Sequence, residues 1–156
     1  DTRTLENDTS GQFLCDALIE NNHILADRQI EIDDMYHLRA RVSSWIASAD
    51  VDVILLTGGT GFTTRDSTPE AINPLLDVDI PGFGELFRHL SYLEIGTSTV
   101  QSRAVAGIAN NTLVFCMPGS TGACRTAWNG ILKEQLNNEF RPCNFAELIS
   151  SGSGGR

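Results

Sequence analysis

Residues 57 to 70 read Thr57-Gly58-Gly59-Thr60-Gly61-Phe62-Thr63-Thr64-Arg65-Asp66-Ser67-Thr68-Pro69-Glu70, and they directly follow the apolar run Val51-Asp52-Val53-Ile54-Leu55-Leu56. Three glycines in four positions allow the backbone to approach a ligand closely and to adopt positive φ angles. The apolar run is typical of a buried strand, and Thr-Pro-Glu after Asp66 is typical of a helix start. A strand, a loop of small residues and a helix N-terminus together form an anion site, so this stretch predicts an α/β fold.

The glycine-rich loop lacks the residues of two common nucleotide-binding motifs. Gly58-Gly59-Thr60-Gly61 is not followed by the Lys-Ser/Thr pair of a P-loop, and it lacks the six-residue spacing of the dinucleotide fingerprint. A purely structural turn is the competing interpretation. The position after a buried strand favours ligand binding, because open α/β sheets bind ligands at that end of their strands. We therefore predict that Thr57, Gly58, Gly59, Thr60 and Gly61 bind a phosphate or a similar anion.

Composition limits the class of protein and its partners. The chain has 156 residues, of which 41% are hydrophobic, and a formal net charge of −9, which fits one domain with a full core. A single lysine and the lack of any Lys/Arg run argue against a nucleic-acid partner. No apolar run approaches the ~18 residues of a membrane span, so no membrane partner is expected. The four cysteines form no CxxC pair; we predict reduced, mostly buried thiols in a cytoplasmic protein without structural zinc.

Helical and strand patterns alternate along the chain. Apolar residues recur at i, i+4, i+7 and i+8 in several segments, whereas short apolar runs lie between them. Strands separated by helices indicate a three-layer α/β/α fold with a mostly parallel sheet, and Asn110-Asn111 predicts one antiparallel hairpin strand. The expected helices are residues 9–21, a helix opened by Asp33-Asp34, 69–76, 81–93 and 120–136; the expected strands are one within 23–32, then 51–56, 105–108 and 112–117.

Two acidic residues follow predicted strands. Asp66 ends the glycine-rich loop, and Asp33 comes after Ile30-Glu31-Ile32. Helix capping is the competing interpretation for both, because carboxylates stabilise helix N-termini. Two acids at the carboxyl ends of two strands can also share one metal ion or act on one reacting group. We therefore predict that Asp66 and Asp33 are catalytic residues that bind Mg²⁺.

Two further stretches could contact an anionic ligand. Pro118-Gly119-Ser120 repeats the order of strand, loop and helix, and Ser120 is also a good helix N-cap. Ser102 and Arg103 precede a strand, and an arginine can bind phosphate through two hydrogen bonds or face solvent. We predict that Ser102, Arg103, Pro118, Gly119 and Ser120 bind the substrate or its phosphate.

The two ends of the chain differ from its middle. The chain opens with polar Asp1-Thr2-Arg3 and then enters a helix, although a parallel α/β sheet usually opens with a strand. We therefore expect an N-terminal strand ahead of residue 1 that this sequence lacks. Residues 1–149 are predicted to form one domain, and residues 150–156 a flexible Gly/Ser tail.

The combined motifs resemble those of molybdenum cofactor biosynthesis proteins of the MoaB/MogA type. The glycine-rich stretch from Thr57 to Ala71 resembles the TGGTG-x4-D-x-TPE/D motif of that family. The resemblance runs from Asp1 to about Leu148, and residues 39–46, 95–99 and 118–128 resemble the MoaB branch. Further matching motifs are Asp8-Thr9-Ser10-Gly11, Pro81-Gly82-Phe83-Gly84-Glu85, Ser102-Arg103-Ala104-Val105-Ala106-Gly107-Ile108 and Met117-Pro118-Gly119.

This resemblance implies a fold, a reaction and an assembly. It implies a molybdopterin-binding fold that forms trimers or a hexamer of two trimers, and an N-terminal strand ending just before Asp1. It implies adenylylation of molybdopterin by ATP and Mg²⁺, with release of pyrophosphate. Asp66 matches the acid of the glycine-rich motif, and Asp33 matches a second family acid. For the contact surface between subunits, Phe83, Leu86 and Phe87 are candidates, with core packing as the competing interpretation.

The sequence departs from the family pattern at two places. Ile32 replaces the proline that precedes the second family acid, and Pro118-Gly119-Ser120-Thr121 replaces the Pro-Gly-Asn/Gln-Pro turn of MogA-type sequences. The second departure leaves two functions open. One is a molybdopterin adenylyltransferase, and the other is a protein of the same pathway that binds or carries molybdopterin without chemistry.

Overall fold

The computed structural model describes residues 3–152, without the side chains of residues 151 and 152. Within this range helices alternate with strands, as the sequence predicts. The helices are α1 (Thr9–Glu20), α2 (Met35–Ala47), α3 (Thr68–Ile72), α4 (Pro81–Ile95), α5 (Thr121–Ala127), α6 (Lys133–Gln135) and α7 (Phe145–Gly152), with 3-10 turns at Asn73–Leu75 and Gly96–Gln101 and a π-turn at Trp128–Leu132. The strands are β1 (Val53–Thr57), β2 (Val78–Asp79), β3 (Val105–Ala109) and β4 (Thr112–Met117).

The sheet has the order β1-β4-β3-β2. β1 pairs in parallel with β4, β4 pairs antiparallel with β3, and β3 pairs antiparallel with β2. Three strands therefore point the same way and β3 alone is reversed, which confirms the mostly parallel sheet with one antiparallel hairpin strand. The hairpin turns at Asn110 and Asn111, whose φ angles are 49° and 60°. Positive φ at both positions is the requirement of the turn type that the asparagine pair predicts.

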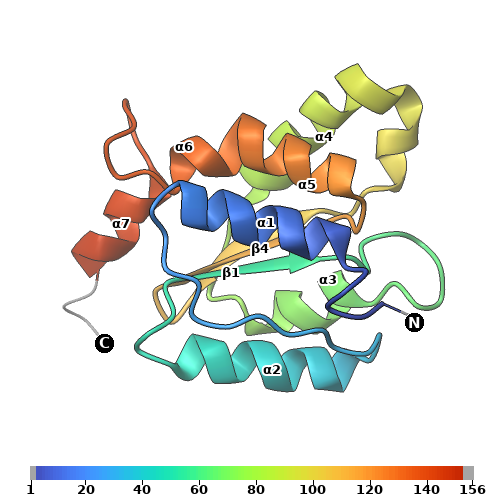
Figure 1. Cartoon of the computed structure of the whole chain (residues 1–156), viewed down its shortest axis with the longest axis horizontal. Helices are drawn as coiled ribbons and strands as arrows, with labels where there is room; N and C mark the ends of the chain where they lie inside the picture. Colours follow the sequence, from blue (N-terminus) through green and yellow to red (C-terminus); the bar gives the residue numbers. More distant parts are fainter. Residues whose placement is uncertain (1–2, 153–156) are drawn as a thin grey trace.

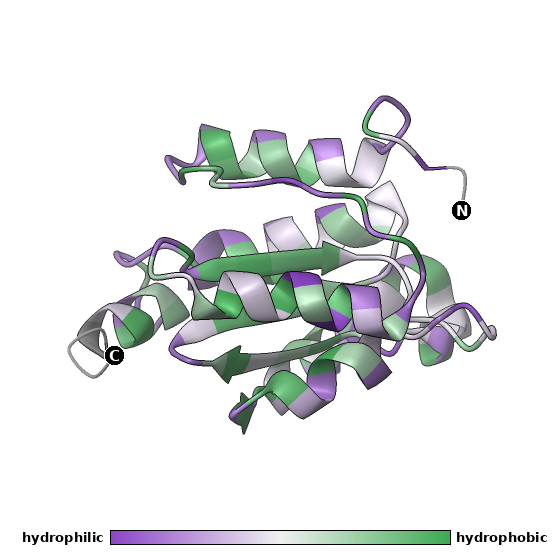
Figure 2. Cartoon of the chain, turned by 90° about the horizontal axis from the view of Figure 1, so that it is seen from below, coloured by the Kyte–Doolittle hydropathy of each residue, from purple (hydrophilic) through white to green (hydrophobic). Residues whose placement is uncertain are grey.

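Helices cover both faces of the sheet and form three layers (Figure 1). α1, α4 and α5 lie on one face, and α2 and α3 lie on the other. Each face has its own buried cluster: one is built around Phe87, Phe115 and Trp128, and the other around Val42 and Ile72. The strands between them are the most continuous hydrophobic elements of the chain (Figure 2). This arrangement confirms the predicted three-layer fold.

The predicted helices are all present, and one further helix, α7, lies at the end of the chain. Residues 121–135 form one rod of α5, the π-turn and α6, close to the predicted 120–136. α7 has no counterpart among the predicted helices, because the composition of its last residues favours a loop. It ends at Gly152, inside the segment predicted as a tail; residues 153–156 lie outside the described range.

The strand predicted within residues 23–32 is wrong. The segment is extended, but it belongs to no strand of the sheet. An extended segment becomes a strand only when a neighbouring backbone takes its hydrogen bonds, and a cavity separates residues 24–31 from β1. The local sequence signal was therefore present, but among the described residues no backbone pairs with this segment.

The cysteines are reduced and mostly buried, as the sequence predicts. All four cysteines are free thiols, and Cys15, Cys116 and Cys124 are buried while Cys143 is exposed. Burial raises the pKa of the Cys116 thiol to about 12, so it carries no thiolate at neutral pH. No helix among the described residues is long and apolar enough to cross a membrane.

Two glycines in the first turn of α4 allow a matched test of packing. A Cβ on Gly84 would lie 2.5 Å from the carbonyl oxygen of Ala104, whereas a Cβ on Gly82 would meet nothing within 4 Å. We expect Gly84→Ala to lower the free energy of unfolding by about 1–3 kcal/mol because the backbone must shift. Gly82→Ala, the control, should leave it unchanged or raise it by up to about 1 kcal/mol. Urea denaturation measures both, and equal stabilities of the two variants would contradict the packing described.

Candidate functional site

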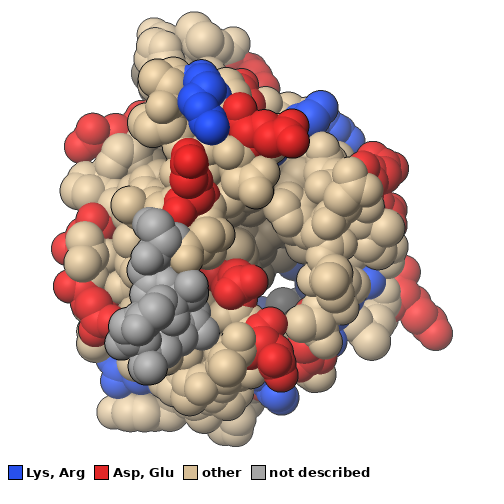
Figure 3. Space-filling model, turned by 90° about the vertical axis from the view of Figure 1, so that its left-hand side faces the viewer, with Lys and Arg blue, Asp and Glu red and all other residues tan. Residues whose placement is uncertain are grey.

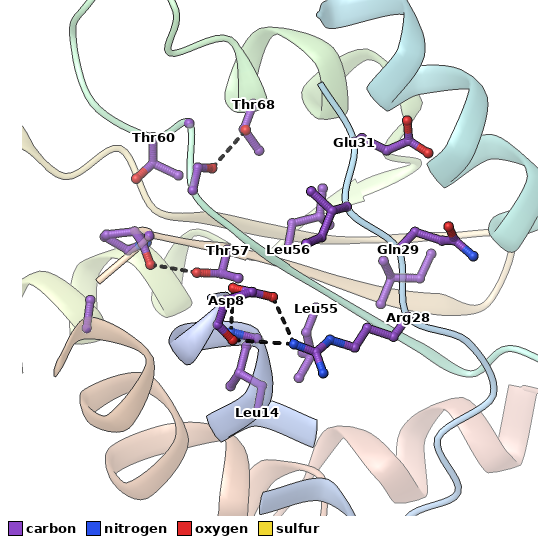
Figure 4. A pocket seen from close by; sticks show the side chains of 18 of the residues that line it. Asp8, Leu14, Arg28, Gln29, Glu31, Leu55, Leu56, Thr57, Thr60 and Thr68 are labelled. Carbon is purple, nitrogen blue, oxygen red and sulfur yellow. Dashed lines mark hydrogen bonds and ion pairs between the residues drawn. The ribbon is translucent and has the colours of Figure 1, made fainter. Parts of the chain in front are cut away.

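One cavity of about 1090 Å³ gathers the predicted site residues at the carboxyl end of β1. Its lining follows β1 along its length and, at the carboxyl end of the strand, includes the glycine-rich loop and the loop that follows β4 (Figure 4). Arg103 is the predicted site residue that does not line it. Those that do are Asp33, Thr57, Gly58, Gly59, Thr60, Gly61, Asp66, Ser102, Pro118, Gly119 and Ser120.

Positive φ angles at two glycines shape the glycine-rich loop. Gly58 and Gly59 have φ angles of 108° and 71°, which side-chain-bearing residues rarely adopt. Thr68, the first residue of α3, closes the loop: its hydroxyl donates to the carbonyl of Gly58 (2.9 Å) and its N–H to that of Gly59 (3.0 Å). A Cβ on Gly59 would lie 2.3 Å from the Thr68 hydroxyl. The glycines are therefore required by the loop itself, whatever it binds.

The loop after β4 lies against the glycine-rich loop. The Thr57 hydroxyl donates to the carbonyl of Pro118 at 3.1 Å, and a Cβ on Gly119 would lie 3.2 Å from the Cα of Gly58. The Ser120 hydroxyl accepts the N–H of Ala123 at 3.1 Å and so caps α5. The parallel pairing of β1 with β4 thus brings two predicted anion-binding loops into contact.

The rim of the cavity offers hydrogen-bond donors. Within residues 3–152, the backbone N–H groups of Gly59 and Thr60 donate to no protein acceptor. Thr60 is itself buried, with 3% of its surface exposed. N–H groups without a partner beside a cavity are ready to bind an anionic oxygen, because a buried unpaired donor is costly.

The two predicted acids differ in their surroundings. Asp66 accepts hydrogen bonds from the hydroxyl and the N–H of Thr63, at 2.7 and 2.8 Å. The hydroxyl of Thr63, the N–H groups of Thr63 and Gly61 and the charge of Arg103 lower the pKa of Asp66, against a smaller effect of burial. Asp33 is exposed and makes no side-chain contact within the described range, while its neighbour Asp34 caps α2. Asp66 is therefore held in its ionised form within the loop, whereas the exposed carboxylate of Asp33 is open to a ligand.

Arg103 holds the glycine-rich loop from outside the cavity. Its guanidinium donates to the carbonyl of Gly61 through Nε (3.0 Å) and Nη2 (2.7 Å), and to the carbonyl of Asp66 at 3.2 Å. It also pairs with Glu70 and lies over the ring of Phe62 at 5.1 Å. These contacts tie both ends of residues 61–66 to α3. The guanidinium of Arg103 therefore already has protein partners. Its predicted binding to a phosphate stays a prediction.

A buried carboxylate, Asp8, lies at the base of the site and was not predicted as a site residue. Its side chain caps α1 by accepting the N–H of Gly11 (3.0 Å), and it pairs with Arg28 at 3.1 Å and with Arg3 at 3.7 Å. Burial raises the pKa of Asp8, but the Gly11 N–H, Arg28 and Arg3 outweigh burial and lower it. The sequence signal for this residue was the pattern Asp8-x-x-Gly11 at a helix start.

The thiol that contacts the glycine-rich loop is not activated as a nucleophile. Cys124 contacts the hydroxyl of Thr57 at 3.2 Å, but burial raises the pKa of its thiol. Among the described residues, no group of three or more His, Cys, Asp or Glu side chains is placed to hold a metal ion. The site can therefore offer backbone donors to an anionic ligand, and the carboxylates of Asp33 and Asp66 to a cation.

The contacts of Arg103 predict the behaviour of the loop. Arg103→Ala removes the donors to Gly61 and Asp66, so we expect faster amide hydrogen exchange over residues 59–68, by roughly tenfold. Arg65→Ala is the matched control, because Arg65 lies in the same loop and makes no side-chain hydrogen bond or ion pair within the described part of the chain. Equal exchange in both variants would show that Arg103 does not hold the loop.

Comparison with known proteins places this chain in a family. A family described as "Probable molybdopterin binding domain" matches residues 2–138. The protein named molybdenum cofactor biosynthesis protein B from Escherichia coli K12 is 59% identical over 140 residues, which are 90% of this chain and 82% of that protein.

Solved structures agree in fold. A crystal structure of a molybdenum cofactor biosynthesis protein B matches with a TM-score of 0.85 and 43% identity, over 100% of this chain and 91% of that one. A tungsten cofactor synthesizing protein, MoaB from Pyrococcus furiosus, matches with a TM-score of 0.75 and 38% identity, over 82% and 81% of the two chains. Because a family model spans most of its length and these relatives share its fold, the chain belongs to the molybdopterin-binding domain family of cofactor biosynthesis proteins.

Proposed function

We propose that this protein acts in molybdenum cofactor biosynthesis, where it binds molybdopterin and transfers an adenylyl group to it from ATP with Mg²⁺, releasing pyrophosphate. The observation that carries this proposal is the meeting of the glycine-rich loop and the loop after β4 at one cavity. The names of the relatives support the pathway, and the family description supports a pterin ligand.

The backbone of the two loops suits a phosphorylated ligand. The N–H groups of Gly59 and Thr60 can take phosphate oxygens, and positive φ angles at Gly58 and Gly59 allow the ligand to approach closely. We assign this loop to phosphate binding. We assign Ser102, Pro118, Gly119 and Ser120, which also line the cavity, to further contacts with the pterin or the nucleotide.

The carboxylates of Asp33 and Asp66 suit Mg²⁺. Magnesium in phosphate-transferring sites is often held by one or two carboxylates together with the substrate phosphates, so this pair of carboxylates fits the ion. Bound with the nucleotide, Mg²⁺ would neutralise phosphate charge. Asp33 keeps both oxygens available, and the lowered pKa keeps Asp66 ionised.

The reaction needs no protein nucleophile. The terminal phosphate of molybdopterin attacks the α-phosphorus of ATP, and the bond to the leaving pyrophosphate breaks. The protein holds the two anionic molecules in line and stabilises the charge on the transferred group. Such a reaction agrees with a site that offers backbone donors and carboxylates, and in which burial keeps the neighbouring Cys124 thiol protonated.

A pterin-binding or carrier protein without chemistry is the second candidate. The hydroxyl of Ser120 is occupied as a helix cap, and Pro118-Gly119-Ser120-Thr121 departs from the turn of MogA-type sequences. Isothermal titration separates the two functions. A carrier binds molybdopterin and shows no Mg²⁺-dependent site for ATP, whereas the transferase binds both.

Replacing Asp66 tests the enzymatic function. We expect Asp66→Asn to lower the rate of adenylylated molybdopterin formation by on the order of 10²-fold, because an anionic ligand for the phosphate-bound ion is lost. The fold should survive, since a carboxylate that accepts hydrogen bonds in a turn contributes about 1 kcal/mol to the free energy of unfolding. Asp79→Asn is the control: Asp79 lies exposed on β2, at the opposite edge of the sheet. Unchanged turnover in the Asp66 variant would assign that residue to the loop turn alone.

We also propose that the protein assembles as a trimer or a hexamer. Of the predicted contact residues, Phe83 and Phe87 are 3% and 1% exposed and belong to the core, and Leu86 is 43% exposed. Further apolar side chains are exposed on the same helix and on the 3-10 turn after it, where a subunit contact can cover them. They are Tyr92, Leu93, Ile95 and Val100, with 54%, 70%, 57% and 74% of their surface exposed.

Charged substitutions on this surface test the assembly. We expect light scattering to give three or six times the chain mass of 17.0 kDa. Leu93→Arg and Val100→Arg should each shift the distribution toward the monomer, because a buried unpaired charge is costly. Ile19→Arg, on the exposed face of α1, serves as the control. A wild-type monomer, or the same shift with Ile19→Arg, would contradict the proposed contact.

A further inference from the structure

Phe62, in the glycine-rich loop, differs from the other phenylalanines in its exposure. The chain has seven phenylalanines, and all of them lie in the part of the chain that the structure describes. Three are buried and three are partly buried, whereas 69% of the surface of Phe62 is exposed. Phe62 also belongs to neither of the two buried clusters. Its ring therefore contributes little to the core of this chain.

A fixed cation covers one face of this ring. The guanidinium of Arg103 lies over the ring of Phe62, 5.1 Å from its centroid. Hydrogen bonds to the carbonyls of Gly61 and Asp66 and the pair with Glu70 hold that guanidinium in place. Arginine commonly stacks on aromatic faces in this way. With Arg103 on one face and most of the residue exposed, the other face of the ring is open to a ligand.

Phe62 lies at the edge of the cavity, close to the backbone donors that we assign to phosphate. Its two neighbours in the chain, Gly61 and Thr63, both line the cavity. The N–H of Thr60, which donates to no protein acceptor within residues 3–152, is two residues away. Two residues span at most about 7 Å along the chain. A ligand that joins a phosphate to a flat ring through a short linker can therefore contact both groups.

Charge favours this end of the molecule for a phosphorylated ligand. The glycine-rich loop lies at the right-hand end of Figure 1, and Figure 3 shows the opposite end. The charged side chains on that opposite face are mainly Asp and Glu, which repel phosphate groups. Around Phe62, by contrast, Arg65 and Arg103 balance the carboxylates of Asp66 and Glu70. The loop therefore combines an open aromatic face with surroundings that accept an anion.

We propose that Phe62, backed by Arg103, is a stacking platform for the planar heterocycle of a phosphorylated substrate. The assignment rests on the proposed function, whose two substrates both carry such a ring: adenine in ATP and the pterin in molybdopterin. Heterocycles of this kind stack on aromatic side chains, whatever their hydrogen-bonding groups. Arg103 is a positioning residue here, because it orders the phenyl ring before the ligand arrives and so lowers the entropy lost on binding.

A purely structural role for Phe62 leads to a different expectation. A ring that only shields the contacts of Arg103 would support the loop for every ligand, including one that has phosphates and no ring. A stacking platform affects only ligands that carry a ring. ATP and inorganic tripolyphosphate share a triphosphate chain and differ in the nucleoside, so comparing their affinities separates the two roles.

Isothermal titration in the presence of Mg²⁺ tests the platform with three probes: ATP, neopterin phosphate and inorganic tripolyphosphate. We expect Phe62→Ala to weaken the binding of at least one of the two ring-bearing probes by about tenfold. Its affinity for tripolyphosphate should equal that of the wild type, which shows that the phosphate loop is intact. Phe62→Trp, which keeps an aromatic face, should restore the lost affinity. Weaker binding of ATP assigns the platform to adenine, and weaker binding of neopterin phosphate assigns it to the pterin.

Tyr36→Ala is the matched control. Tyr36 is 68% exposed and has the guanidinium of Arg39 over its ring at 5.4 Å, but it lies on α2, outside the glycine-rich loop. The platform is overturned if Phe62→Ala binds both ring-bearing probes as the wild type does, if it loses tripolyphosphate by the same factor, or if Tyr36→Ala has the same effect. Ring-dependent binding without adenylyl transfer would keep the platform and reject only the transferase. Failure of the wild type to bind either ring-bearing probe would reject both.

Discussion

The parallel pairing of β1 with β4 is the contact on which the site depends. It places Thr57 opposite Met117, and the hydrogen bond from the N–H of Gly58 to the carbonyl of Met117 (2.9 Å) extends it by one residue into the loops. Both loops leave the sheet at its carboxyl end, where the hydroxyl of Thr57 joins them. Parallel strands of an open sheet commonly present their ligand-binding loops in this way. A site built from backbone groups requires such rigid support, because its donors cannot adjust by changing rotamer.

The glycine-rich loop needs hydrogen-bond partners for its backbone carbonyls, and neighbouring residues supply them. Gly58 and Gly59 adopt positive φ angles, and residues 58–66 belong to no strand that would take up their carbonyls. Thr68 takes two of these carbonyls, at Gly58 and Gly59, and Arg103 takes two more, at Gly61 and Asp66. The start of α3 and an arginine before β3 thus replace the hydrogen bonds that a strand would supply. The cavity side of the loop keeps the donors of Gly59 and Thr60 for a ligand.

Local signals in the sequence predicted local structure well. Asn110-Asn111 indicated a hairpin because the turn imposes positive φ on the same two residues, and the glycine-rich loop was found because strand, glycines and helix start are adjacent in the chain. The partners of Arg103 could not be predicted, since Gly61 and Glu70 are distant in sequence and meet it only after the layers pack. The sequence could not assign Phe83 and Phe87 to the core either, because an apolar helix face has the same residue pattern in a core and in a subunit interface.

The segment 24–31 shows most clearly what local sequence leaves out. Ile30 and Ile32 alternate with polar residues as in a strand, and the chain adopts the extended geometry, but a strand is a property of two backbones and not of one. The same reasoning applies to β1, whose apolar residues suit burial on both faces and of which only Ile54 is buried. Local composition therefore predicts the extended conformation of residues 24–31, but it does not predict which backbone, if any, pairs with them. Pairing is decided only when the layers pack, as it is for the partners of Arg103.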